Sequence, residues 1–237
     1  MRGITMIYVM SDIHGCYDKY IAMLDKIQFS DRDTLYILGD VVDRGADGIK
    51  ILLDIMRRNH IELLMGNHEY FMAALLSDFQ LPIDCKTVLD NRMLKALKLW
   101  FDDGGESTFS TFLSLSANQQ KQIASFLKQL RFYVQIEVSN QQYVFVHSGF
   151  QNFSLKRSLE SYQKEELLFC RPHLQTVYFP EKIVIVGHTP TFFYHQKYTG
   201  KIIKKNQIIH IDCGCAYPKS GVLGCLRLDD LSVYYIS

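Results

Sequence analysis

The chain has 237 residues, of which 48% are hydrophobic and 22% are charged. This composition is typical of a folded globular protein and excludes intrinsic disorder, which requires low hydrophobicity and a high net charge. The 26 basic residues nearly balance the 25 acidic residues, which argues against nucleic-acid binding through bulk charge but leaves room for a compact phosphate site.

The chain shows no targeting or membrane segment. No apolar run approaches the roughly 18–20 residues that a membrane-spanning helix needs. Residues 1–10 contain one arginine and a short apolar run but no small-residue cleavage site, which predicts a first strand rather than a signal peptide. We therefore expect a cytoplasmic protein. The six cysteines do not predict a disulfide framework in a chain of this length, so most are expected to be reduced and buried, with Cys16 the accessible exception.

Five short apolar runs, rich in β-branched and aromatic residues, predict buried strands. Each run is followed directly by a polar turn that contains histidine or aspartate. Because ligands of open α/β sheets bind beyond the carboxyl ends of the strands, these turns can converge on one site although they are far apart in sequence. The runs are residues 6–10, 34–38, 61–65, 143–146 and 183–186, and the turns begin at Ser11, Gly39, Gly66, His147 and Gly187.

The intervals between the first strands show helical patterns. Residues 18–28 carry isoleucine and leucine at helical spacing, and helical segments at 49–59 and 68–77 follow the next two turns. This alternation of strand and helix is typical of a βαβ arrangement.

The middle and the second half of the chain differ in pattern. Residues 87–130 are predicted to be helical, because an apolar stripe around Trp100 is followed by an amphipathic segment at 118–130. We interpret them as a helical insertion in a single domain of residues 1–237, since no linker interrupts the chain. The predicted fold class is α/β, with two packed mixed β-sheets flanked by helices. The strands predicted in the second half are residues 132–138, 142–146, 183–186, 207–211, 222–228 and 232–236.

The first two polar turns combine carboxylates with histidine or arginine. Asp12 and His14 are two residues apart at a strand end, where alternate residues face the same side, so both could ligate one divalent metal. A structural loop is the competing interpretation. Asp40 ends the next strand in a glycine-bounded turn and is also placed to ligate a metal. Asp43 and Arg44 could orient a partner and bind an oxyanion, unless the turn is an exposed ion pair.

The later turns supply further nitrogen and oxygen donors. Asn67 can ligate a metal through its amide oxygen or act as a helix N-cap, and His68 can be an acid or base near neutral pH. His147 and His188 follow two more strands; a single histidine there is more often structural, but the pair completes a ligand set. Such donors suit two cations such as manganese, iron or zinc, sharing an aspartate at a separation of roughly 3.5–4 Å. The candidate ligands are Asp12, His14, Asp40, Asn67, His147 and His188.

Three motifs, in this order, carry a family resemblance. Asp12-Ile13-His14-Gly15, Gly39-Asp40-Val41-Val42-Asp43-Arg44-Gly45 and Gly66-Asn67-His68-Glu69 resemble the signature of the PPP phosphoprotein phosphatases, within the calcineurin-like metallophosphoesterase superfamily. The segments that begin at His147 and Gly187 resemble the two later metal motifs, so the resemblance runs from residue 6 to about residue 228. The small bacterial and phage-type members are the most similar in size.

The resemblance implies a two-metal centre. In that family a hydroxide that bridges two divalent metals attacks phosphorus; manganese is expected here, with iron or zinc as alternatives. Asp12 and His14 would hold the first metal, and Asp40 would bridge to the second. The second metal would also be held by Asn67, His147 and His188.

The resemblance also implies an acid and two phosphate ligands. His68 would protonate the leaving alkoxide while Asp43 holds its ring, and Arg44 would bind the phosphate. Residues 167–171 are similar to the family's Leu-Leu-Trp-x-Arg segment, with phenylalanine in place of tryptophan, so Arg171 is the candidate second phosphate arginine. One departure is the segment 102–105, Asp-Asp-Gly-Gly, which stands where relatives tend to have Asn-Gly-Gly.

These roles imply a metal-dependent serine/threonine protein phosphatase, with phosphoproteins or small phosphoesters as partners and neither nucleic acid nor membrane. A symmetrical bis(5'-nucleosyl)-tetraphosphatase is the alternative; Glu69, where those enzymes tend to carry aspartate, modestly favours protein substrates. A catalytically silent phosphate-binding protein is disfavoured, because no ligand, acid or phosphate arginine is missing from the motifs. The histidines that match no motif and are assigned no role are His60, His173, His195 and His210.

Overall fold

The computed structural model describes residues 5–79, 81–84, 87 and 89–237. Cys85, one of the cysteines expected to be reduced, lies outside the described residues. The described cysteines are free thiols, and three of them are buried; Cys16 is partly exposed as expected, but Cys170 is partly exposed as well.

The first sheet combines three parallel strands with an antiparallel pair. The parallel strands β1 (Ile7–Met10), β2 (Thr34–Ile37) and β3 (Ile61–Leu63) come from the first half of the chain. The C-terminal strands β9 (Leu223–Arg227) and β10 (Val233–Ile236) extend this sheet beyond β1, in the order β10-β9-β1-β2-β3.

The second sheet is also mixed, with the order β4-β5-β6-β8-β7. Its parallel strands are β5 (Gln141–Val146), β6 (Lys182–Val186) and β8 (Ile208–His210). The antiparallel edge strands are β4 (Tyr133–Val138) and β7 (Ile203–Lys205).

The two sheets pack face to face because their strands alternate two apolar faces. In β1, Val9 enters the core between the sheets, whereas Tyr8 and Met10 enter the core under the helices. In β5, Phe145 enters the core between the sheets, and its ring lies 4.9 Å from that of Tyr36 in β2. The sequence-based prediction of two packed mixed sheets is therefore confirmed.

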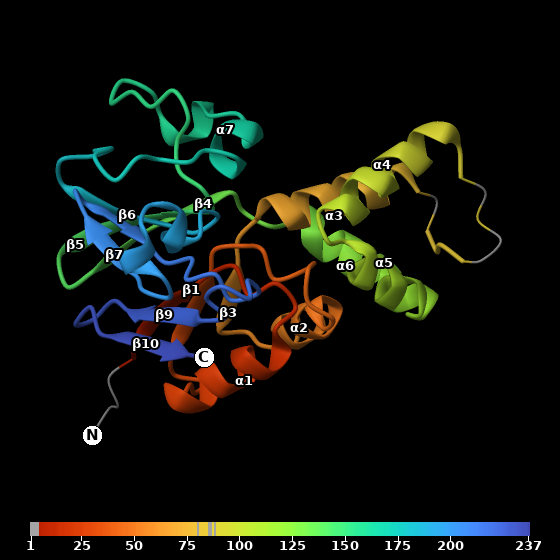
Figure 1. Ribbon diagram of the computed structural model, residues 1–237, viewed down its shortest axis with the longest axis horizontal. Coiled ribbons are helices and arrows are strands. Elements are labelled where there is room, and N and C mark those ends of the chain that lie inside the picture. Colours follow the sequence, from red (N-terminus) through yellow and green to blue (C-terminus); the bar gives the residue numbers. More distant parts are fainter. Residues whose placement is uncertain (1–4, 80, 85–86, 88) are drawn as a thin grey trace.

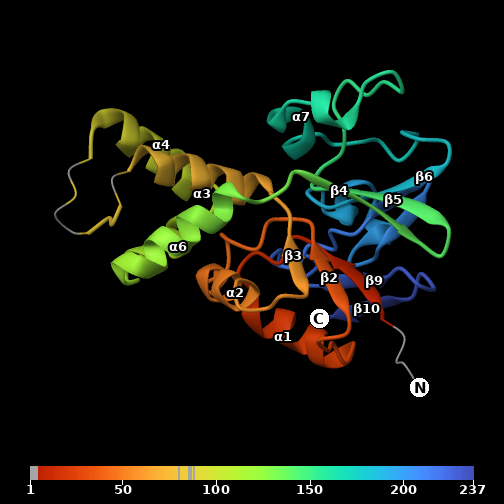
Figure 2. The ribbon, with the colours of Figure 1, turned by 180° about the vertical axis from the view of Figure 1, so that it is seen from behind.

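The helices flank these sheets in two groups (Figures 1 and 2). The helices α1 (Tyr17–Lys26) and α2 (Gly48–Ile55) lie on the outer side of the first sheet. A second group projects to one side and consists of α3 (Asn67–Asp78), α4 (Asn91–Asp102), α5 (Glu106–Leu113) and α6 (Ala117–Lys128). The short helix α7 (Lys164–Leu168) packs against the outer side of the second sheet, where Leu167 joins Val144 and Val184. Three 3₁₀ turns lie at Leu159–Ser161, Thr191–Phe193 and Gln196–Tyr198.

The differences from the predicted elements are local. The second helix ends at Ile55 instead of residue 59, and β3 ends at Leu63 instead of residue 65. Sequence patterns missed β7 and α7, because three and five residues are too few for a recognisable period. The helices α4–α6 occupy most of residues 87–130, while the division of the chain into one domain with an insertion stays a prediction. None of the helices in the described part of the chain has the length and apolar character required to cross a bilayer.

Candidate active site

The polar turns predicted from sequence meet beyond the carboxyl ends of the strands. The turn after β1 is joined to the turn after β2 by a hydrogen bond from the Asp12 amide to the Gly39 carbonyl, 3.1 Å long. The turn after β6 is joined to the one after β5, since the Gly187 amide donates to the His147 carbonyl at 2.8 Å. The His188 amide donates to the Asp12 carboxylate at 3.0–3.1 Å, which joins the two pairs of turns, so four distant segments from both sheets meet at one centre.

The turns hold several functional side chains in left-handed backbone conformations. Such a conformation costs about 1–2 kcal/mol for a residue other than glycine, so the surrounding contacts must maintain it. The candidate site residues with positive φ are Asp12 (53°), His14 (46°), Asp40 (56°), Asp43 (68°), Arg44 (65°) and His188 (64°). Sequence patterns did not predict this strain.

Close backbone approach explains the glycine at residue 39. A Cβ atom on Gly39, whose φ is 96°, would lie 2.5 Å from the backbone of Gly66. A side chain at residue 39 would therefore push apart the turns that carry Asp40 and Asn67.

Asp40 lies at the centre of the site. Its Oδ2 atom is 3.4 Å from His147 Nε2, 3.7 Å from His14 Nε2 and 3.9 Å from His68 Nε2. Its Oδ1 atom accepts the backbone N–H of His68, 3.1 Å away, at the start of α3. Burial alone would raise the pKa of Asp40, but the rings of His147 and His68 hold it well below its usual range. A carboxylate kept ionised among imidazoles fits a ligand shared by two cations.

A second group of donors surrounds Asn67. Its Oδ1 atom is 2.9 Å from both His147 Nε2 and His188 Nδ1. Burial and the nearby His147 ring lower the pKa of His188 to about 3, so this ring is neutral and able to ligate. Burial opposes a charge on His147, yet the Asp40 carboxylate raises the pKa of that ring to about 10.

The ring orientations fit metal binding. The Nδ1 atom of His14 is 3.0 Å from the Val42 carbonyl, and that of His147 is 2.7 Å from the Leu38 carbonyl. In the tautomers that donate these bonds, both rings present Nε2 towards Asp40, the usual arrangement for a ligand histidine. Within the described residues, two donor clusters could hold an ion, and they share Asp40. The first consists of His14, Asp40 and His68, and the second of Asp40, His147 and His188.

Asp12 lies in the same centre, next to the turn that carries His188. Its carboxylate accepts the backbone N–H of His188 at 3.0–3.1 Å and the hydroxyl of Ser11 at 2.5 Å. Burial and the Asp40 carboxylate raise the pKa of Asp12 to about 6. His68 completes the cluster with His14 and Asp40, and ligation of the first cation by Asp12 stays a prediction.

His68 is held as a candidate acid. Its Nδ1 atom is 2.7 Å from Asp43 Oδ2, and the indole N–H of Trp100 donates to the same oxygen at 2.7 Å. Burial works against a charged ring, but the Asp40 and Asp43 carboxylates raise the pKa of His68 to about 9. A ring that stays protonated at neutral pH can donate a proton to a leaving group. Sequence patterns identified the pair and missed Trp100, which they assigned to an apolar stripe.

Arg44 lies beside this ring. Its guanidinium nitrogens are 2.7 Å from His14 Nε2 and 3.2 Å from His68 Nε2, and the group lies 5.2 Å from the centre of the Tyr217 ring. The side chain is partly exposed, and Asp103 Oδ1 lies 3.8 Å from it. The arginine is thus placed at the opening of the centre, as phosphate binding requires. Tyr217 and Asp103 had not been predicted at the site.

Arg171 lies at the rim of the centre. Its side chain is exposed, and its charge contributes to lowering the pKa of His188. Within the described part of the chain it makes no hydrogen bond or ion pair. Its phosphate-binding role stays a prediction.

Glu69 is buried and binds only the backbone. Its carboxylate accepts N–H groups from Asp40 (2.7 Å), Val41 (2.9 Å), Val42 (3.3 Å) and Gly66 (3.1 Å). It therefore supports the turn that carries Asp40. Glutamate at residue 69 is thus explained by its hydrogen bonds to the loop backbone, and its presence is weaker evidence about substrate preference.

We expect Glu69→Gln to lower the free energy of unfolding by about 3 kcal/mol, because the amide brings a donor among four buried N–H groups. Urea unfolding measures the change, and metal content should fall as well. Glu62→Gln is the matched control: this half-exposed glutamate pairs with Arg131 at the surface, so its loss should cost less than about 1 kcal/mol. Equal effects of the two substitutions would contradict the role assigned to Glu69.

Asp212 is a buried acidic residue of the centre that sequence reasoning did not assign. It follows β8, and its Oδ1 atom accepts the Gly214 amide at 2.8 Å. Burial and the nearby Asp12 carboxylate raise its pKa well above the usual range. The signal was present, since Asp212 follows a strand end as Asp12 and Asp40 do.

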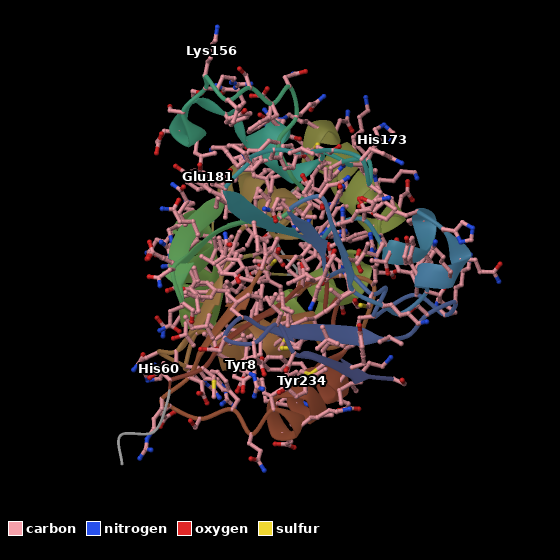
Figure 3. All side chains as sticks on the ribbon, turned by 90° about the vertical axis from the view of Figure 1, so that its left-hand side faces the viewer. Tyr8, His60, Lys156, His173, Glu181 and Tyr234 are labelled. Carbon is pink, nitrogen blue, oxygen red and sulfur yellow. The ribbon has the colours of Figure 1, made fainter. Side chains whose placement is uncertain are left out.

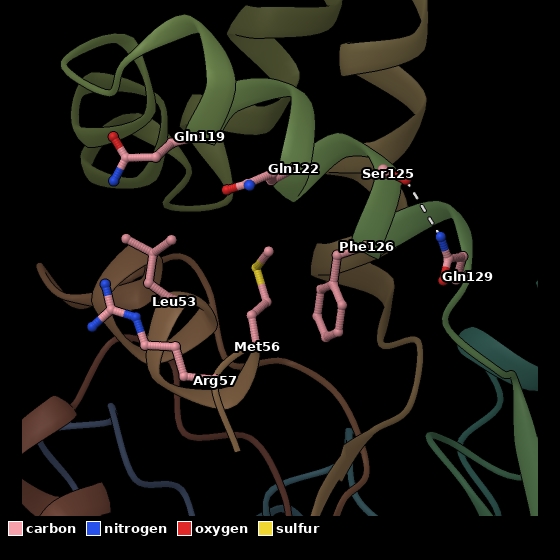
Figure 4. Close-up of a pocket in the computed structure, with 8 residues that line it drawn as sticks. All are labelled: Leu53, Met56, Arg57, Gln119, Gln122, Ser125, Phe126 and Gln129. Carbon is pink, nitrogen blue, oxygen red and sulfur yellow. Dashed lines mark hydrogen bonds between the residues drawn. The ribbon is translucent and has the colours of Figure 1, made fainter. Parts of the chain in front are cut away.

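Among the described residues, the donor clusters include none of the histidines that match no motif. His60 and His173 are exposed at opposite ends of one face (Figure 3). His210 is buried, and burial lowers its pKa to about 4. A hollow of about 430 Å³ between the end of α2 and α6 is lined by Met56, Phe126 and polar amides, without carboxylate, histidine or cysteine among its lining residues (Figure 4). It therefore offers none of the donors that a metal centre requires.

Comparison with known proteins agrees with this geometry. A family model described as calcineurin-like phosphoesterase matches residues 5–214. A curated symmetrical bis(5'-nucleosyl)-tetraphosphatase from Salmonella paratyphi B is 38% identical over 72 residues, 30% of this chain. The match spans only 26% of the length of that relative.

Solved structures share the fold at low identity. A chain provisionally named a diadenosine tetraphosphatase aligns over 99% of this chain and 94% of its own length, with a TM-score of 0.67 and 16% identity. A protein serine/threonine phosphatase from Saccharomyces cerevisiae, similar to human PP5, aligns over 98% of this chain and 79% of its own, with a TM-score of 0.60 and 15% identity. A cold-active protein-tyrosine phosphatase from a Shewanella species aligns over 99% of this chain and 81% of its own, with a TM-score of 0.55 and 17% identity. At these identities the likeness shows the fold alone.

Proposed function

Because this chain belongs to the calcineurin-like phosphoesterase family of metal-dependent hydrolases, we propose that it is a serine/threonine protein phosphatase. The observation that carries the proposal is the pairing of His68, held by Asp43 at 2.7 Å, with Arg44 at 3.2 Å. An acid and a phosphate ligand side by side, next to the donors around Asp40, are what hydrolysis of a phosphomonoester needs.

The residues that would hold two cations are Asp12, His14 and Asp40 on one side and Asp40, Asn67, His147 and His188 on the other. Bound divalent cations supply polarisation of the phosphoryl oxygens and lower the pKa of the attacking water. Nitrogen and oxygen donors favour manganese, with iron or zinc as alternatives.

The side chains around the cations have separate tasks. Arg44 binds and orients the phosphoryl oxygens, and Arg171, at the rim near His188, supplies a second positive charge. His68 donates its proton to the departing serine or threonine oxygen. Asp43 keeps the ring in the required orientation and stabilises its positive charge, as Trp100 in turn orients Asp43.

The alternative function is a symmetrical dinucleoside tetraphosphatase, supported by the 72-residue likeness to the curated Salmonella enzyme. The leaving group of that reaction would be a nucleoside diphosphate. That group would lie near Asp103, whose carboxylate is 3.7 Å from His68 Nε2 and 3.8 Å from Arg44 Nη2.

A side-by-side assay tests the choice. The manganese-loaded protein is offered a panel of phosphoserine and phosphothreonine peptides and diadenosine tetraphosphate, and kcat/KM is measured for each. We expect kcat/KM for the best peptide to exceed that for the dinucleotide by about tenfold or more, because the ratio reports differential transition-state binding. The reverse ratio would replace the proposal with the alternative.

A further inference from the structure

The helices α3 and α4 lie side by side (Figures 1 and 2). Their side chains line a groove of about 350 Å³. From α3 it is lined by Phe71, Ala74 and Leu75, and from α4 by Leu99 and Trp100. These positions recur at helical spacing, so each helix turns an apolar stripe to the groove. The mechanism described above uses only the indole N–H of Trp100 from this lining and gives no role to its apolar surface.

The groove begins on the leaving-group side of the candidate centre. Trp100, which lines it, donates its indole N–H to Asp43, the residue that holds His68. Asp103, also in its lining, lies 3.7 Å from His68 Nε2. Since His68 would protonate the departing oxygen, whatever is attached to that oxygen emerges next to this groove.

The groove is apolar and open to solvent. Leu99 is 72% exposed and Phe71 is 42% exposed, and the Phe71 ring lies 5.9 Å from that of Phe169. Exposed apolar side chains gathered in one groove indicate a binding surface more than isolated ones do. The α3 stretch from Phe71 to Asp78 rises about 10 Å, which corresponds to about three residues of extended peptide.

The charges of the groove are acidic. Asp78 and Asp103 lie among its lining residues, and none of these lining residues is basic. Arg92 pairs with Asp78 at 2.8 Å, whereas Asp103 is 50% exposed beside Arg44. When Arg44 engages a phosphoryl group, the half-exposed Asp103 carboxylate at the mouth of the groove is available to a basic side chain.

We propose that the α3–α4 groove binds the polypeptide of a phosphoprotein substrate next to the phosphorylated residue. The groove takes an apolar side chain two to four residues from the phosphoserine or phosphothreonine, and Asp103 favours a lysine or arginine between them. This inference rests on the protein phosphatase function proposed above and names the class of peptide that this site prefers.

Kinetics with matched peptides test the groove. Each peptide carries one phosphoserine and varies at two positions. Three residues before or after the phosphoserine it has leucine or serine, and between the two it has lysine or glutamate. For the wild type we expect kcat/KM to be about tenfold higher with leucine than with serine on one of the two sides. Leu99→Gln should abolish this preference and leave the hydrolysis of p-nitrophenyl phosphate unchanged. Asp103→Asn should reduce the preference for lysine over glutamate.

Leu155→Gln is the matched control, since Leu155 is 66% exposed and lies outside the groove. It should keep the leucine preference, and both glutamine variants should melt at the wild-type temperature.

Hydrolysis of leucine and serine peptides at equal rates by the wild type would overturn the groove proposal alone. Leu99→Gln could instead lose hydrolysis of diadenosine tetraphosphate and keep the wild-type rates of peptide hydrolysis. That result would assign the groove to a nucleoside and would also overturn the groove proposal. Hydrolysis of p-nitrophenyl phosphate with no peptide hydrolysis would overturn the protein phosphatase function itself, and the groove proposal with it.

Discussion

Removal of divalent cations is expected to lower the phosphoesterase activity of this chain by about 10³-fold, and manganese should restore it. The cations supply several kcal/mol of transition-state stabilisation, which no arginine or histidine of the site replaces. The donors around Asp40 lie 3.4–3.9 Å from its Oδ2 atom. Because apolar cores hold the sheets together, we expect a chelator to empty the site without unfolding them. Activity on p-nitrophenyl phosphate, measured with metal content before and after chelation, provides the test.

Two substitutions sharpen this test. Asp40→Asn should reduce the content of both cations, because the carboxylate is common to the two donor clusters. His188→Asn should reduce the content of one, since His188 belongs to a single cluster. Full activity in excess chelator, with less than stoichiometric metal, would refute the two-cation centre.

His68→Asn is expected to lower kcat on phosphopeptides by about 10²–10⁴-fold, the usual contribution of a general acid. The effect should be smaller on p-nitrophenyl phosphate, because a phenolate leaves without needing a proton. Stopped assays on both substrates measure the difference. Asp43→Asn should show the same pattern more weakly, since it removes the partner of the ring and keeps the ring itself.

Metal content distinguishes the acid from a ligand. His68 lies in one donor cluster with His14 and Asp40, so its position alone permits either role. If His68→Asn keeps both cations, the acid role stands. Loss of one cation would make His68 a ligand and leave the acid to be found elsewhere.

The local patterns of the sequence predicted the strands and most of the donor residues that the structure brings together. Apolar runs such as residues 34–38 predict buried strands because side chains alternate over a few residues, and this period is a property of the chain itself. Asp12, His14 and Asp40 could be identified because each follows such a strand directly. The elements β7 and α7 were not found, because they are too short to show a periodic pattern.

Residues that act through distant partners could not be assigned in this way. Trp100 is part of an apolar helical stripe by sequence, yet its indole N–H binds Asp43, 57 positions earlier in the chain. Glu69 is part of a family motif by sequence, yet its carboxylate holds the backbone of residues 40–42. Both roles depend on how α3 and α4 pack against the turns after β2, which no local pattern encodes.

The amino-acid sequence by itself determined the fold class, the family and the set of donors at the strand ends, because these depend on short-range periodicity and on motifs of a few residues. The tertiary structure alone decided the left-handed backbone at Asp40 and Arg44, the neighbours of His68, and the groove between α3 and α4. The physical reason is that backbone strain, buried hydrogen bonds and grooves arise from contacts between segments far apart in the chain. Their free energy is set by packing in three dimensions.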